Sequence, residues 1–403
     1  MSDRKLYGAR RSFHKASVAP NLASLCVAAT LLAWRILYHE KGRAVLATGG
    51  IFIAILLVFI ELGFFIAVPQ GGMLVYDHLR FDLLLCSKNY AFQAEPWQFP
   101  RARVTDAAKT RGVARATPLY FAGAKWQEPR GGDRLDAFVI GFDPAADPFA
   151  VADIERQGPV LEHPDTMLVD DATRSIFGPI NAGTEVLLDN SKVTIGGDYT
   201  LGTGFLGMAV AIMNEANFFR LFAPRTTDLV NLGLITLTPG TDPGTVAATL
   251  AKALPDDVEI FTRDALKQHE DKYWTTRTSV GLIFGSGLIV SFIVGIMVLY
   301  QTLATQISRH LPQFATLKAI GYGDHYLAAV VMIEAAMIVL VAFVPAAMAA
   351  LAIYAQLRSA TLLPVLLTPT RLLAVLVITL LMSAASAFLS LGHLRRADPA
   401  DVF

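Results

Sequence analysis

The sequence has little charge and little cysteine. Of its 403 residues, 17% are Asp, Glu, Lys or Arg and 54% are hydrophobic, and its mean hydropathy is +0.47. A chain this apolar cannot keep its whole surface in water, which indicates a membrane protein. Two cysteines, Cys26 and Cys86, are too few for a disulfide framework or a zinc cage. We therefore expect neither a disulfide nor a metal site.

Motifs that bind nucleotides or perform catalysis are also missing. The sequence has no G-x-x-x-x-G-K-[ST] loop to hold phosphates, no complete H-E-x-x-H zinc motif and no G-x-S-x-G elbow. We predict that the chain is not an enzyme and has no catalytic, cofactor-binding or metal-binding residues. Any ATP and Mg must be bound by a partner chain. The net charge of zero argues against a nucleic-acid partner.

One glycine pattern resembles a dinucleotide fingerprint. Gly202, Gly204 and Gly207 form G-x-G-x-x-G, and Asp228 follows 21 residues after the last glycine. The fingerprint requires a parallel strand–turn–helix unit, and the orientation derived below places this stretch outside the membrane, where such cofactors are scarce. A glycine-rich turn is the favoured interpretation.

Four apolar runs are long enough to cross a bilayer, which takes about 20 residues. The predicted fold class is a multi-pass α-helical membrane protein with a large extracytoplasmic α+β domain between helices 1 and 2. The first run is too long for the core of a signal peptide and should remain as an anchor. The spans are 44–68, 279–303, 326–354 and 372–394.

The distribution of charge predicts the orientation. Residues 1–43 contain eight basic and two acidic side chains, so the positive-inside rule places the N-terminus in the cytoplasm. Four spans return the C-terminus to the same side. Residues 69–278 carry a net charge of −7 and the rest of the chain +7. The net charge of zero is thus the sum of two opposite charges on the two sides of a membrane. The same orientation places Cys26 and Cys86 on opposite sides of that membrane.

The remaining segments follow from this topology. Residues 69–278 mix β-rich runs, turn signals and helical patterns, which is typical of an α+β domain. Its last part, residues 262–281, reads as one continuous helix into the second span; we call it the stalk. The other predicted segments are a cytoplasmic segment with an interfacial helix (1–43), a cytoplasmic loop (304–325), a short outer loop (355–371) and a cytoplasmic tail (395–403).

Two carboxylates and a proline interrupt the spans. Because burying a carboxylate in hydrocarbon costs at least ~2.5 kcal/mol, Glu61 and Glu334 each require a partner or a role. Glu334 either orients the bundle, for example through Lys318 or Arg309, or acts in gating. Glu61 faces an aqueous vestibule or relays protons. Pro345 is a candidate hinge or a packing irregularity.

Glycines in the second span indicate a close helix contact. Gly281, Gly285, Gly287 and Gly295 permit close approach of a neighbouring helix. We predict a homodimer seam on this face.

The loop between the second and third spans contains a short amphipathic helix. Pro312 suits its first turn, the helix runs from Gln313 to Ile320, and Gly321 and Gly323 end it. A helix parallel to the membrane is either a docking element or an incidental connector. The candidate docking residues are Pro312, Phe314, Thr316, Leu317, Lys318, Ile320, Gly321 and Tyr322.

At these residues the chain resembles the MacB/FtsX-type permeases of ABC exporters, and most closely their DevC-type branch. The resemblance is carried by EDKYWTTRTSVGLIFGSG (270–287), YQTLATQISRHLPQFATLKAIGYGDHYL (300–327), Glu334-Ala, ADPADVF (397–403) and LGTGFLG (201–207). The chain departs from that branch at Glu61 and after Gly207, which leaves the substrate open.

The resemblance implies a homodimeric permease in a bacterial inner membrane. The short helix would then be the coupling helix for a separate cytoplasmic ATPase. The outer domain would engage a periplasmic membrane-fusion protein and, through it, a TolC-type outer-membrane channel. ATP-driven motion would pass through the stalks to drive efflux of a lipid-like or amphipathic substrate (mechanotransmission). The alternative is an FtsX-like signalling protein that activates a periplasmic partner such as a cell-wall hydrolase.

Overall fold

The computed structural model describes residues 41–129, 131–202, 209–320, 322–361 and 363–395. The predicted interfacial helix, Cys26 and the motif at 397–403 lie outside these residues. The described chain forms two compact units. The first unit contains the described residues of Met1–Leu56, Ser291–Ala346 and Ala374–Phe403. The second contains those of Leu57–Val290 and Ala347–Leu373.

Long apolar helices confirm the predicted class of a multi-pass membrane protein. They are α2 (Lys41–Asp77), α9 (Ser279–Arg309), α11 (Asp324–Thr361) and α12 (Pro369–Arg395). In the described residues, four helices are long and apolar enough to span a bilayer, over Thr48–Asp77, Ser279–Arg309, His325–Arg358 and Pro369–Gly392. The first helix continues through Pro69, where the sequence analysis ends the span, because one proline removes a single helical hydrogen bond without having to end the helix.

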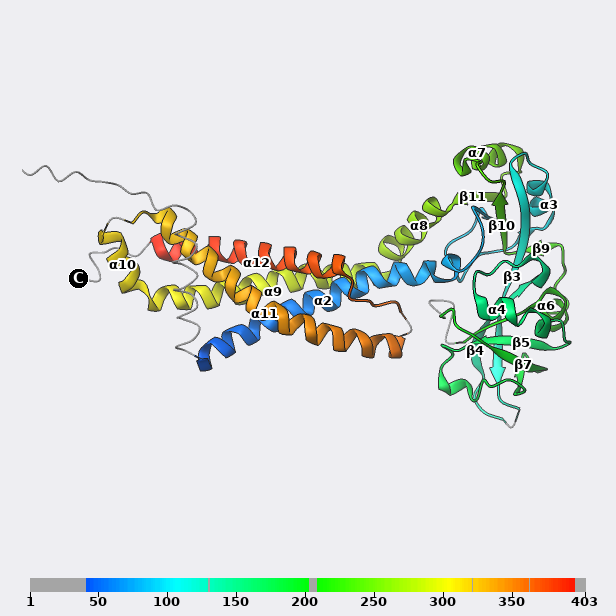
Figure 1. The fold of residues 1–403 in the computed structure, drawn as a ribbon, viewed down its shortest axis with the longest axis horizontal. Helices are drawn as coiled ribbons and strands as arrows, with labels where there is room; N and C mark the ends of the chain where they lie inside the picture. Colours follow the sequence, from blue (N-terminus) through cyan, green and yellow to red (C-terminus); the bar gives the residue numbers. More distant parts are fainter. Residues whose placement is uncertain (1–40, 130, 203–208, 321, 362, 396–403) are drawn as a thin grey trace, which may run out of the picture. The chain divides into compact units, whose positions relative to one another are not determined.

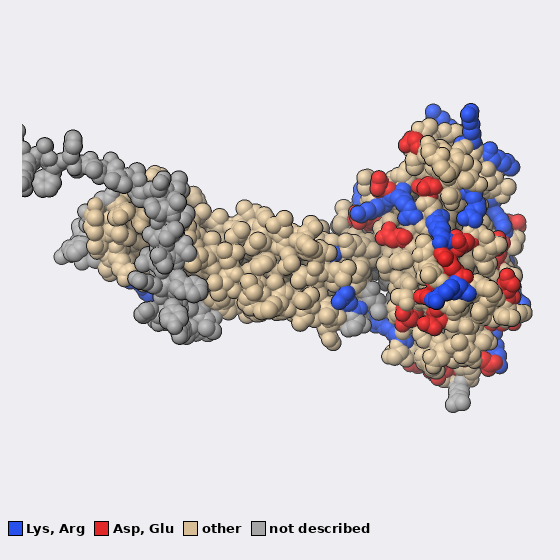
Figure 2. Space-filling model, in the orientation of Figure 1, with Lys and Arg blue, Asp and Glu red and all other residues tan. Residues whose placement is uncertain are grey.

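Small residues bring the helices of the first unit together. Gly295 of α9 lies against Met382 of α12, and Ala54 of α2 is 3.6 Å from the position of a Cβ at residue 295. The Ser386 hydroxyl donates to the Ile296 carbonyl at 2.9 Å. Large apolar side chains such as Met297 and Phe388 are exposed instead. Figure 2 shows few charged side chains along these helices and many on the outer domain, as expected for surfaces in lipid and in water.

The second unit contains a nine-stranded mixed sheet in the order β11-β1-β10-β3-β4-β8-β5-β7-β6 (Figure 1). Neighbours pair antiparallel except β4–β8 and β5–β7, which are parallel. The long strand β3 pairs with β10 through its first half and with β4 and β6 through its second. The strands are β1 (Leu83–Ser87), β3 (Val113–Gln127), β4 (Leu135–Phe142), β5 (Thr166–Asp170), β6 (Glu185–Leu188), β7 (Ser191–Tyr199), β8 (Val210–Asn214), β10 (Leu232–Leu237) and β11 (Val258–Thr262). A separate ribbon pairs β2 (Phe99–Pro100) with β9 (Leu229–Val230).

Both faces of this sheet are covered, which explains why β1 is apolar at consecutive positions. Leu83 and Leu85 enter one core, and Leu84 and Cys86 enter the other. Helices α3 (Ala102–Ala108), α6 (Glu215–Leu221) and α7 (Pro243–Ala253) pack on the first face. The second is covered by α4 (Ala152–Arg156), α5 (Gly158–Leu161), α8 (Arg263–Lys272) and the end of α2. This mixture is the α+β domain predicted from the sequence.

Candidate functional site

The predicted docking helix is present as α10 (Leu311–Ile320), between α9 and α11. His310 starts it: its carbonyl accepts from the backbone N–H groups of Gln313 and Phe314, both at 3.0 Å. The Thr316 hydroxyl donates to the Pro312 carbonyl at 2.8 Å. Pro312 is thus in the first turn, where its missing N–H costs no helical hydrogen bond.

The side chains of α10 divide into a buried and an exposed set. Phe314 is 7% exposed and anchors the helix, whereas Ile320 is 71% exposed. Leu317 and Lys318 are half-buried. Beyond the helix, Tyr322 is 39% exposed and its ring lies 4.6 Å from that of Tyr326. Gly321 lies outside the described residues. An anchored helix with an exposed isoleucine and tyrosine at its end is suited to binding another protein.

Glu61 lies at a close contact between α2 and α9. Its carboxyl group occupies the space that a Cβ at Gly287 would require, and one carboxyl oxygen is buried without a hydrogen-bond partner among the described residues. The absence of a side chain at Gly287 therefore makes room for Glu61.

Glu334 and Pro345 lie on α11. Glu334 is 6% exposed and therefore buried within the described helices. Pro345 is inside the helix, which continues to Thr361, and Ala342 and Ala346 on either side of it are fully buried.

The glycines of α9 do not form a free seam. Gly287 faces Glu61, Gly285 lies 3.6 Å from the Phe65 ring, and Gly295 packs on α2 and α12. The glycine face is thus filled by helices of the same chain, so the location predicted for the homodimer seam is wrong. The exposed face of α9 carries large apolar residues instead: Leu282, Ile283, Ile289, Val290, Ile293, Val294 and Met297.

Arg263, at the start of α8, fixes the outer end of α2. Its guanidinium donates to the carbonyls of Tyr76, Leu79 and Phe81 at 3.2, 2.5 and 3.0 Å. The same group lies 4.1 Å from the centre of the Phe81 ring. A cation at the C-terminus of a helix satisfies its last carbonyls and its dipole. The stalk and the first span are therefore joined at the base of the outer domain.

A buried polar network surrounds Glu270, two residues before the end of α8. Glu270 is fully buried, and the Tyr90 hydroxyl donates to its carboxyl group. The hydroxyls of Tyr90 and Tyr76 are hydrogen bonded at 2.7 Å. Gly72 of α2 leaves room on the other side, since a Cβ there would lie 2.7 Å from the Trp274 indole nitrogen and 3.0 Å from a Glu270 oxygen.

Burial raises the pKa of Glu270 to about 7. The hydroxyl of Tyr90, the indole N–H of Trp274 and the backbone N–H of Gln93 favour the carboxylate and oppose this shift, while Asp271 adds to it. Desolvation prevails because no cation is among the groups that shift this pKa. Glu270 therefore changes its charge near neutral pH.

The stalk is not the continuous helix predicted from the sequence. After α8, residues Tyr273–Arg277 form a π-helical turn, Thr278 is extended (φ −107°, ψ 155°), and α9 begins at Ser279. Hydroxyl groups of Thr275, Thr276 and Thr278 donate to the carbonyls of the residue four positions earlier. Such side-chain bonds compete with the regular helix pattern, and no proline or glycine within Tyr273–Thr278 signals the break.

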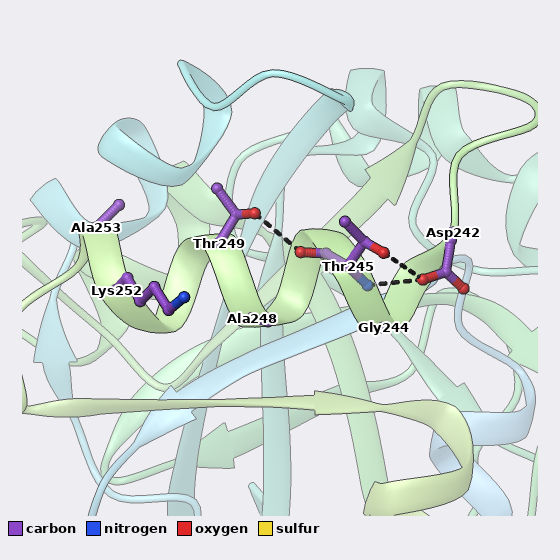
Figure 3. Close-up of a pocket in the computed structure, with 7 residues that line it drawn as sticks. All are labelled: Asp242, Gly244, Thr245, Ala248, Thr249, Lys252 and Ala253. Atoms are coloured by element: carbon purple, nitrogen blue, oxygen red, sulfur yellow. Dashed lines mark hydrogen bonds between the residues drawn. The ribbon is translucent and has the colours of Figure 1, made fainter.

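Two other features serve structure. Figure 3 shows a hollow on α7 lined by Asp242, Gly244, Thr245, Ala248, Thr249, Lys252 and Ala253. Asp242 caps this helix by accepting from the N–H and hydroxyl of Thr245, and these hydrogen bonds lower its pKa. At the glycine pattern, residues 203–208 lie outside the described chain, and the next described element is strand β8. The phosphate-binding motif places its glycines directly before a helix.

Glu270 is not among the site residues expected from the sequence, because it lies in a polar run. A weak signal was present: Leu266, Glu270 and Trp274 are spaced four residues apart, which places them on one face of a helix. Leu266 and Trp274 are apolar and buried, so their spacing indicates that the carboxylate between them is buried too.

The apolar helices and the domain inserted after the first of them define a multi-pass membrane protein with a large extracytoplasmic domain. Residues 285–399 match the family described as FtsX-like permease C-terminal. This match includes α10, α11 and α12, and it confirms the resemblance to MacB/FtsX-like permeases. No curated protein matches the sequence.

Three solved structures that match part of the chain are an outer region of MacB, an outer domain of YknZ and a permease domain. The periplasmic region of MacB from Actinobacillus actinomycetemcomitans has 10% identity and a TM-score of 0.34, and covers 48% of this chain and 94% of its own. The extracellular domain of the noncanonic ABC-type transporter YknZ from Gram-positive bacteria has 10% identity and a TM-score of 0.32, covering 45% and 99%. A domain of a putative permease from Porphyromonas gingivalis has 20% identity and a TM-score of 0.28, covering 38% and 73%.

Proposed function

We propose that this chain is the permease subunit of an ABC-type tripartite exporter in a bacterial inner membrane. A separate cytoplasmic ATPase binds ATP and Mg, and α10 is the coupling helix that receives its motion. The chain works as a homodimer with both termini in the cytoplasm. Its stalks transmit motion to the outer domains, which drive efflux of a lipid-like or amphipathic substrate of the kind handled by DevC-type permeases.

The observation that carries this proposal is the position and surface of α10. The helix lies inside the region that matches the FtsX-like family, it connects two predicted spans, and it exposes Ile320 while Phe314 is buried. An exposed apolar residue on a short anchored helix supports the binding of a partner protein. The outer domain in turn offers a folded surface for a membrane-fusion protein and, beyond it, a TolC-type channel.

A pull-down of the tagged full chain from mild detergent tests the docking assignment. We expect an ABC ATPase to co-purify with the wild-type chain and to be lost from Ile320→Asp. A carboxylate in an apolar contact should cost more than about 1.4 kcal/mol, which is a tenfold loss of affinity.

Ile176→Asp is the matched control, because Ile176 is an exposed isoleucine of the outer domain (57% exposed). This variant should retain the ATPase. If Ile320→Asp retains it equally well, α10 is not the coupling helix. A membrane-fusion protein among the partners supports export, whereas a cell-wall hydrolase would indicate FtsX-like signalling.

A further inference from the structure

The two helical connections between the spans and the outer domain are both irregular. In α2, Pro69 has no N–H to donate to the Phe65 carbonyl, so one helical hydrogen bond is missing. In the other connection, the π-helical turn at Tyr273–Arg277 and the extended Thr278 separate α8 from α9. Prolines and π-helical turns are the usual positions at which helices bend.

These two irregularities face each other. They meet at one narrow gap that leaves no room for a water molecule and is lined by Phe65, Val68 and Pro69 from α2 and by Trp274, Thr275, Val280 and Gly281 from the stalk. Gly281 is required there, because a Cβ would collide with the Thr275 carbonyl. The irregular positions of the two connections, Pro69 in α2 and the π-helical turn in the stalk, are therefore in contact with each other.

On the outer-domain side of these positions, the contacts are dense. Arg263 ties α8 to the end of α2, and Leu266 is fully buried in the core of the domain. Phe92 stacks on Tyr273 at 4.7 Å and lies edge-on to Trp274 at 5.4 Å. With Glu270 held by Tyr90, α8 belongs to the outer domain as one body.

On the span side, α2 and α9 are joined to each other. Phe64 stacks on Phe284 with ring centres 4.8 Å apart and planes at 11°. One turn further along, Glu61 fits against Gly287. The Tyr354 hydroxyl of α11 also donates to the Phe59 carbonyl of α2. These helix segments thus form a second body.

We propose that Pro69 and Trp274–Gly281 form a paired hinge, about which the joined segments of α2 and α9 tilt as one body relative to the outer domain. Because two connections cross the same level, bending is confined to a common axis and twisting about either helix is resisted. The tilt can keep the contacts within each body, whereas contacts across the hinge must adjust, namely the hydrogen bond from Arg371 to Gln70 and the packing of Val365 in one cluster with Trp274. It does require both connections to bend together, so making one connection stiffer restricts the whole motion.

Distances between spin labels on the full chain in lipid nanodiscs test this proposal without an ATPase or a cargo. Cys26→Ser and Cys86→Ala remove the native thiols, and dilution with unlabelled chain restricts the signal to pairs within one chain. One pair spans the hinge, at Lys252→Cys on α7 and Ile289→Cys on α9. A second pair, Lys252→Cys and Lys267→Cys, lies on the outer-domain side only. All three positions are exposed.

The pair across the hinge should give a broader distance distribution than the second pair. Pro69→Ala restores the missing helical hydrogen bond. It should narrow the distance distribution of the pair across the hinge towards the width of the second pair. Pro345→Ala removes a proline from the interior of α11 and should leave the distance distribution across the hinge unchanged. Equal widths for the two pairs, or a width across the hinge that does not respond to Pro69→Ala, would overturn the proposal. The spin-label measurement does not depend on the pull-down, so the hinge can be confirmed even if no ATPase co-purifies.

Discussion

At Glu270, two physical demands on a buried carboxyl group oppose each other. Removal from water favours the neutral acid, whereas the Tyr90 hydroxyl and neighbouring N–H groups favour the anion. The titratable groups that interact with this carboxyl are Tyr76 on α2, Cys86 on β1 and Tyr90 on the following loop, with Asp271 and Tyr273 after it in the chain. None of them supplies a positive charge, so the pKa stays near 7.

Stability should therefore depend on pH through this residue. The pKa of Glu270 is raised in the folded chain, so the folded state binds more protons than the unfolded state between its ordinary value of 4.5 and about 7. Its contribution is fully present below that range and is lost as the pH rises through about 7, by about 3 kcal/mol in total. Between pH 5 and pH 8, the Tm of the wild-type chain in detergent should fall more than that of Glu270→Gln.

Asp170, whose pKa burial also raises to about 7, titrates in both chains and cancels from the comparison. Glu259→Gln, at an exposed position on β11, is the control and should behave as the wild type. Parallel curves for Glu270→Gln and the wild type would show that Glu270 does not titrate in this range.

Among the elements, those set by local pattern could be predicted and those set by distant contacts could not. Four long apolar runs predict the spans, and Pro312 with the glycines that follow Ile320 predicts the start and end of α10. The path of α2 through Pro69 could not be predicted, because its end is held by Arg263, almost 200 residues further along the chain. The same holds for the sheet order, since β1 pairs with β11, the last strand of the domain. At Gly287 the sequence shows a small residue but not that Glu61 fills the space.

The joint between α8 and α2 can be tested at Arg263. Arg263→Met keeps an aliphatic side chain against Phe81 but removes the donors to the Tyr76, Leu79 and Phe81 carbonyls. Each lost charged hydrogen bond costs about 1.5–3 kcal/mol, so the last turn of α2 should open more readily. Hydrogen–deuterium exchange of residues 72–79 in the full chain should become faster by at least tenfold.

Lys267→Met is the matched control, because Lys267 is an exposed cation on the same helix. Exchange in residues 72–79 should stay at the wild-type rate in this variant. An equal acceleration in both variants would mean that Arg263 does not hold the end of α2.

Across the whole molecule, charge and hydrophobicity divide at the same boundaries. The acidic outer segment forms a folded domain with two cores, while the spans expose apolar side chains and show few charged ones in Figure 2. The proposed orientation follows from the excess of basic residues outside this domain.

Labelling of single cysteines tests that orientation. Ser191 on β7 and Gln313 on α10 are both exposed in the structure, so the membrane and not burial decides their access to reagent. In cells expressing chains without native cysteines, Ser191→Cys should react with an impermeant maleimide once the outer membrane is permeable. Gln313→Cys should react only after the inner membrane is opened. The reverse pattern would invert the topology.

The pairing of β1 with β11 has a consequence for how such proteins diversify. Leu83 lies opposite Thr262, so the domain's first and last strands are neighbours on one edge of its sheet. The residues between β1 and β11 form an insert, and the pairing of these two strands holds its two ends together. Evolution can therefore enlarge, trim or exchange this insert without altering the spacing at which the two helices leave the bilayer. A chimera that joins the outer domain of a relative at these two strands should preserve the spans and change only what the domain recognises.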